Sequence, residues 1–75
     1  MKNYIHETSI VDNNVSIGNN TRIWQWCHIS ENVIIGESCN IGQNVFIDKN
    51  VNIGKNSKIQ NNVSIFKEVN IGDNV

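Results

Sequence analysis

The chain has 75 residues, with six Lys or Arg and seven Asp or Glu, and a formal net charge of −1. The charges are scattered without a basic stripe, which argues against duplex nucleic acid as a partner. No apolar run approaches membrane-spanning length and no signal peptide opens the chain, so no membrane association is expected. The length fits one domain, residues 1–75, or part of one.

An aliphatic residue recurs at every sixth position, from Ile5 to Ile71, and each of these positions holds Ile or Val. All five glycines follow one of these residues directly. Four positions after each aliphatic residue stands a small or β-branched one. We call the every-sixth position the first inward position and the one four residues later the second. Eleven of the thirteen Ile occupy the first and seven of the eight Val occupy the second, which indicates two inward sites of different size. So strict a period predicts a repeat architecture.

Each repeat predicts one short strand and one tight turn. The strands pair apolar ends with a mostly polar middle residue, the alternation of a strand with one buried face. After a first strand ending at Ile5, they are expected at residues 9–11, 15–17, 21–23, 27–29, 33–35, 39–41, 45–47, 51–53, 57–59, 63–65 and 69–71. The three residues between strands are rich in Gly and Asn. Because both tolerate positive φ, we assign each trio to a turn.

Gly18, Gly36, Gly54 and Gly72 are 18 residues apart, so three repeats make one circuit. The predicted fold is all-β: a triangular solenoid of parallel strands with 18 residues per coil and about four coils. At ~4.8 Å per coil the stack is roughly 20 Å tall. Solenoids normally end in a cap, and the last repeat reaches Val75 without a change of composition. We therefore expect the front section of a longer domain, or a chain that depends on oligomer contacts.

Cys27 and Cys39 both fall at the inward small position, twelve residues apart and hence on different walls. We interpret them as core thiols, which fits a reducing cytoplasm. Two His and two inward Cys do not supply the converging ligands of a zinc site, so no metal is expected.

Several outward residues break the pattern. Ile10, Trp24, Trp26 and Phe46 cannot all be core, because the inward positions are already filled. Such a cluster indicates a contact surface, either between subunits or for a ligand. His28 is either a general base or a hydrogen-bonding surface histidine.

Amides also stand in the turns. Gln43 and Asn61 offer paired donors and acceptors that suit sugar hydroxyls or a uracil edge, although turn chemistry explains such residues as well. Asn44 and Asn62 are more simply explained as turn residues.

The repeat resembles the hexapeptide repeat of left-handed parallel β-helix acyltransferases, and the left hand comes from that resemblance. Four segments are similar to bacterial N-acetyltransferases that acetylate the 3-amino group of a UDP-linked 2-acetamido-3-amino-2,3-dideoxy-glucuronic acid. These segments are Thr21–Trp24, His28–Ile29, Ile41–Ile47 and Lys58–Ser64.

The resemblance implies a cytoplasmic homotrimer that uses acetyl-CoA in bacterial surface-polysaccharide (O-antigen) synthesis, with active sites between neighbouring solenoids. From the outward aromatic residues and amides we predict a nucleotide-sugar site formed by Trp24, His28, Gln43, Phe46 and Asn61. An Asn that approaches the sugar amine in this family would lie beyond Val75. No catalytic residue is therefore assigned, His28 remains a candidate, and the 75-residue chain alone is expected to be inactive.

Three alternatives stay open. The first is an acyltransferase for another amino sugar or another small acceptor. The second is a protein similar to γ-class carbonic anhydrases, which bind zinc through His at subunit interfaces. The third is a non-enzymatic solenoid, although an ice-binding face would need Thr ladders and the chain has only Thr8 and Thr21.

Overall fold

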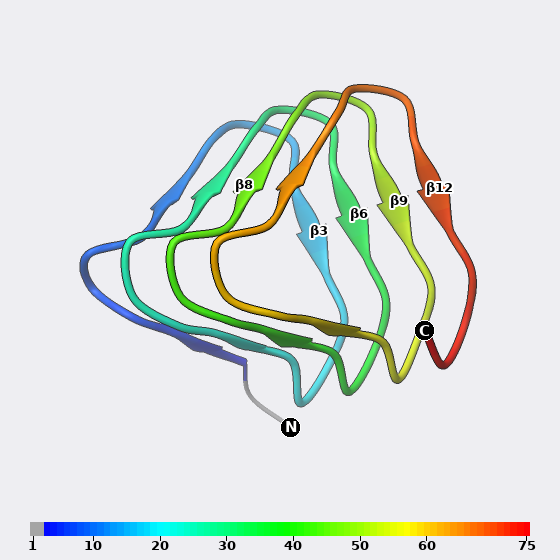
Figure 1. Ribbon diagram of the computed structural model, residues 1–75, viewed down its shortest axis with the longest axis horizontal. Helices are drawn as coiled ribbons and strands as arrows, with labels where there is room; N and C mark the ends of the chain where they lie inside the picture. Colours follow the sequence, from blue (N-terminus) through cyan, green and yellow to red (C-terminus); the bar gives the residue numbers. More distant parts are fainter. Residues whose placement is uncertain (1–2) are drawn as a thin grey trace.

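The computed structural model describes residues 3–75, which form twelve two-residue strands joined by turns. The strands are β1 (Tyr4–Ile5), β2 (Ile10–Val11), β3 (Ser16–Ile17), β4 (Arg22–Ile23), β5 (His28–Ile29), β6 (Ile34–Ile35), β7 (Asn40–Ile41), β8 (Phe46–Ile47), β9 (Asn52–Ile53), β10 (Lys58–Ile59), β11 (Ser64–Ile65) and β12 (Asn70–Ile71). They wind as stacked triangular coils, with the N-terminus in the first coil and the C-terminus in the last (Figure 1).

Three four-stranded parallel sheets form the walls of this prism. Sheet A contains β1, β4, β7 and β10, sheet B contains β2, β5, β8 and β11, and sheet C contains β3, β6, β9 and β12. Each residue pairs with the one 18 positions later, as Tyr4 does with Arg22 and Ile29 with Ile47. The predicted fold class, a left-handed parallel β-helix with three walls, 18-residue coils and about four turns, is confirmed.

The strands are one residue shorter than predicted. The small inward residue before each strand gives its carbonyl to the preceding coil, as Cys27 does to the N–H of Ile10. Where the preceding coil has a hydroxyl side chain at this position, the N–H of the small residue donates to that hydroxyl and not to a strand carbonyl. Cys27 N–H, for example, donates to Ser9 Oγ at 3.0 Å. A strand needs both groups in the ladder, so regular pairing begins one residue later.

The core consists of the two inward positions of each repeat, as predicted. The Ile residues from Ile23 to Ile65 in the first position are buried, and so are Thr21, Val33, Val45, Val51 and Ser57 in the second. Cys27 and Cys39 are buried free thiols, which confirms their interpretation as core residues. Inward residues of the outermost coils, such as Ile5, remain exposed because no coil covers them.

The prediction for the turns needs one correction. Positive φ falls on the third turn residue of each repeat from Asn14 to Asn74, with values between 56° and 66°, and no glycine has positive φ. The glycines are needed for another reason. A Cβ on Gly18 would lie 2.6 Å from the backbone nitrogen of Glu37, and one on Gly36 would lie 2.7 Å from that of Lys55. Glycine therefore lets successive coils approach closely at this corner.

Small polar residues of the inward position tie successive coils together. Thr21 Oγ1 donates to the carbonyl of Gly36 at 2.8 Å, and Ser57 Oγ donates to that of Gly72 at 2.9 Å. Cys39 Sγ points in the same way to the carbonyl of Gly54 at 3.1 Å. These bonds satisfy corner carbonyls that the strand ladders leave out.

Residues 3–75 include no helix long and apolar enough to cross a membrane.

Candidate functional site

The outward strand residues differ from wall to wall. Sheet B presents Ile10, His28, Phe46 and Ser64, sheet C presents Ser16, Ile34, Asn52 and Asn70, and sheet A presents Tyr4, Arg22, Asn40 and Lys58. Sheet B exposes Ile10 and Phe46 in register on either side of His28.

His28 and Phe46 lie side by side on sheet B. Their ring centroids are 5.6 Å apart in an edge-to-face arrangement. His28 Nε2 also lies 3.0 Å from Asp12 Oδ2, in the turn that follows β2. A carboxylate only accepts hydrogen bonds, so Nε2 is the donor in this pair, and the pair does not use Nδ1. This pair gives His28 a fixed orientation that sequence reasoning did not foresee.

Gln43 and Asn61 stack in the turns between sheets A and B. Gln43 N–H donates to Asn61 Oδ1 at 2.8 Å, so the Asn61 oxygen is used in the fold and its amide NH2 remains for a ligand. In the next turn position Asn44 Nδ2 donates to Asn62 Oδ1 at 2.9 Å, and both residues have positive φ. This ladder agrees with the interpretation of Asn44 and Asn62 as turn residues.

The contacts of the Trp24 side chain are with sheet A. Its ring is half-buried against sheet A, with the centroid 5.3 Å from that of Tyr4. Its indole Nε1 donates to Asn40 Oδ1 at 3.0 Å. The structure thus joins His28 to Phe46 and Gln43 to Asn61, while Trp24 contacts sheet A.

Trp26 was not among the predicted ligand residues, yet its conformation singles it out. It occupies the positive-φ turn position with φ 62°, where eight of the twelve repeats have Asn, and it is 67% exposed. A bulky residue in left-handed geometry is unfavourable, and an exposed ring gains little from packing. The replacement of Asn by Trp was the sequence signal for a surface role.

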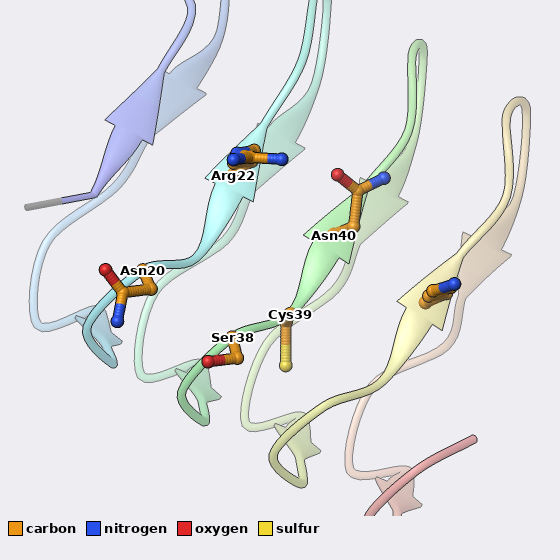
Figure 2. Close-up of a pocket in the computed structure, with 6 residues that line it drawn as sticks. Asn20, Arg22, Ser38, Cys39 and Asn40 are labelled. Carbon is orange, nitrogen blue, oxygen red and sulfur yellow. The ribbon is translucent and has the colours of Figure 1, made fainter.

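A hollow of about 500 Å³ opens on sheet A. It is lined by Asn20, Arg22, Ser38, Cys39, Asn40 and Lys58. Figure 2 shows Arg22 and Asn40 on neighbouring strands, with Asn20 and Ser38 in the turns that lead into them. Sequence analysis did not select these residues.

In the part of the chain that the structure describes, no group of three His, Cys, Asp or Glu side chains is placed to hold a metal ion.

Two family profiles match the chain. The bacterial transferase hexapeptide profile (six repeats) matches residues 14–49, and the hexapeptide repeat of succinyl-transferase matches residues 32–67. Each profile covers just under half of the chain, and over these residues the chain carries the hexapeptide repeat that both profiles describe. No curated protein matches the sequence at a significant level.

Among solved structures the chain is similar to a perosamine N-acetyltransferase from Caulobacter crescentus. That structure is a crystal structure of a His-to-Asn mutant in complex with CoA and GDP-perosamine. The match has a TM-score of 0.50 and 14% sequence identity, and it covers 96% of this chain and 46% of that chain. At this identity the likeness concerns the fold, and this hexapeptide-repeat chain spans less than half of its structural neighbour.

Proposed function

We propose that this hexapeptide-repeat protein is part of an acetyl-CoA-dependent N-acetyltransferase. Its acceptor would be the 3-amino group of a UDP-linked amino sugar used for bacterial surface polysaccharide. The observation that carries the proposal is the exposed set on sheet B and the adjoining turns: the Asp12–His28 pair, Phe46 and the stacked amides of Gln43 and Asn61. The CoA and GDP-perosamine bound to the structural neighbour support an acyl-CoA donor and a nucleotide-linked amino sugar.

The reaction in this proposal is attack of the sugar amine on the thioester carbonyl carbon. A C–N bond forms, the C–S bond breaks, and the amine proton passes to a base or to the departing thiolate. Because a neutral amine is already nucleophilic, most of the protein's contribution is positioning of the two substrates and stabilisation of the oxyanion.

The proposed roles follow from the chemistry of each side chain. Nδ1 of His28, held by Asp12 through the opposite nitrogen, accepts the amine proton. Phe46 offers an apolar surface for the sugar or base. The amides of Gln43 and Asn61 donate to hydroxyl or carbonyl oxygens, and Trp24 borders the nucleotide side.

The same proposal includes assembly. The protein would act as a cytoplasmic homotrimer with the sheet B surface at the cleft between subunits. Residues 1–75 would be the front section of a longer domain whose further coils complete the coenzyme side.

The test is an assay of free CoA thiol released from acetyl-CoA by the full-length protein. Acceptors would be a UDP-linked 3-amino sugar, a GDP-linked amino sugar, or none. We expect release that depends on the UDP-sugar. Gln43→Ala should raise KM for the sugar, and His28→Asn should lower kcat by about 100-fold, the lower range for loss of a general base.

Ser16→Ala on sheet C is the matched control and should behave like the native protein. Preference for the GDP-sugar would replace the proposed acceptor with another nucleotide sugar. An unchanged KM in Gln43→Ala together with an unchanged kcat in His28→Asn would refute the proposed site.

A further inference from the structure

The outward face of sheet A is the only wall of the described structure with Lys or Arg on its strands. Arg22 on β4 and Lys58 on β10 stand in one row, separated by Asn40 on β7. The chain's other described basic residues, Lys49, Lys55 and Lys67, are in turns. Strand positions on sheets B and C carry no Lys or Arg. The two cations are therefore gathered on one face.

This row lacks a compensating negative charge. The outward strand residues of sheet A are Tyr4, Arg22, Asn40 and Lys58, and none is acidic. Among residues 3–75 the ion pair within bonding distance is that of His28 with Asp12, so Arg22 and Lys58 have no carboxylate partner. The nearby acidic residue Glu37 is in a turn and not on a strand of sheet A. It stacks with Lys55 and Asp73, which occupy the same turn position in the following coils.

Asn40 is oriented as a donor between the two cations. Its Oδ1 accepts the indole N–H of Trp24 at 3.0 Å, which fixes which end of the amide is occupied. Its Nδ2 makes no hydrogen bond to the part of the chain described, although Asn40 is half-buried. Tyr4 packs against the Trp24 ring and holds it in place. The row thus presents a guanidinium, an amide NH2 and an ammonium group, all donors.

The hollow of about 500 Å³ lies over the same residues. β4 and β10, which are separated by β7, are about 10 Å apart. The long side chains of Arg22 and Lys58 can converge over Asn40 across that distance. Two positive charges and a fixed amide donor suit an anion with several oxygens, because each donor finds its own acceptor. A diphosphate matches this set better than a single carboxylate.

We propose that Arg22, Asn40 and Lys58 form a binding site for the diphosphate of an organic ligand. A nucleoside diphosphate sugar and CoA both carry this group. The assignment to a substrate rests on the proposed function, whereas the anion site itself does not.

The test is isothermal titration of the full-length protein with inorganic pyrophosphate, UDP and CoA, without an acyl donor or amino sugar. We expect pyrophosphate to bind and to weaken as salt is added. Arg22→Gln and Lys58→Gln should each raise its Kd by about tenfold, and Asn40→Asp, which puts a carboxylate in the centre of the row, should abolish binding. Lys67→Gln, an exposed turn lysine, is the matched control and should bind as the native protein does.

A second variant tests the orientation of the amide. Trp24→Phe keeps an aromatic ring but removes the indole donor, so Asn40 can rotate and pyrophosphate affinity should fall by a few fold. Far-UV circular dichroism of each variant checks that the coils remain formed.

Competition identifies the ligand. Displacement of pyrophosphate by UDP assigns the site to the nucleotide sugar, and displacement by CoA alone assigns it to the coenzyme. Equal pyrophosphate affinity in native protein, Arg22→Gln and Lys58→Gln, or no binding at millimolar pyrophosphate, would overturn the inference. Either result leaves acetyl transfer measurable, so failure of this site is distinguishable from failure of the proposed function.

Discussion

At the residue scale, the first and third turn positions impose different requirements on their residues. The first turn position must be small where coils press together, and the third must accept positive φ. Gly36 meets the first need and Asn56 the second. A sequence shows that Gly and Asn are frequent, but only the stacked coils show which constraint acts on each.

Gly36 tests the packing constraint. It does not have positive φ, but a Cβ on Gly36 would lie 2.7 Å from Lys55 N. In urea unfolding we expect Gly36→Ala to lower the free energy of unfolding by about 1–3 kcal/mol, as overpacking does. An unchanged free energy of unfolding would contradict the packing explanation.

Trp26 tests the cost of left-handed geometry. Trp26→Asn restores the residue found at the equivalent Asn44 and Asn62, and should raise the free energy of unfolding by roughly 0.5–1 kcal/mol. Trp26→Phe keeps a ring at positive φ and should leave stability near the native value. A large loss of stability in Trp26→Asn would mean that the ring packs into the fold of the isolated chain and is not a surface residue.

At the scale of elements, strands of two residues are too short to be held by their own ladders alone. Corner carbonyls need additional donors, and the small inward residues provide them from the preceding coil. Because Thr, Cys and Ser all do this, the column Thr21, Cys39 and Ser57 is functionally uniform despite its mixed composition.

Ser57 tests this role. Ser57→Ala removes the donor to the Gly72 carbonyl and should lower the free energy of unfolding by about 0.5–1.5 kcal/mol, the net value of one hydrogen bond, because the exposed Gly72 can bind water instead. Ser57→Cys should retain more stability, since Cys39 makes the equivalent contact one coil earlier. Thermal unfolding by circular dichroism gives both values. Equal stability of the Ala and Cys variants would show that the donor contributes nothing.

At the scale of the whole molecule, two exposed apolar side chains are aligned on one wall of the prism. Ile10 is 58% exposed and Phe46 is 39% exposed, in register on sheet B. Such an aligned row is typical of a surface that another protein covers. The proposed homotrimer supplies that cover and, at the same time, a cleft beside His28.

Sedimentation velocity of the full-length protein tests the assembly. We expect a trimer at micromolar concentration, and the double variant Ile10→Ser with Phe46→Ser should shift it toward monomer because the apolar row is lost. Ile34→Ser, which removes an exposed Ile from sheet C, is the control and should remain trimeric. A native protein that is monomeric throughout this concentration range would refute the proposed assembly.

The six-residue period determined the two inward positions and the burial of Cys27 and Cys39, and the 18-residue spacing of four glycines determined the triangular coil. It could do so because a regular repeat fixes which side chains meet the axis, whatever the details of each turn. It also placed outward residues in rows 18 positions apart. The period did not determine the directions of those side chains.

Only the tertiary structure decided those directions, because they depend on contacts between coils that no local propensity contains. The hydrogen bond from His28 to Asp12 orients a histidine that the sequence offered only as a candidate. The hydrogen bond from Trp24 to Asn40 directs the Trp24 ring toward sheet A. It also orients the Asn40 amide between Arg22 and Lys58. Atoms that meet across coils, rather than residues along the chain, define these sites.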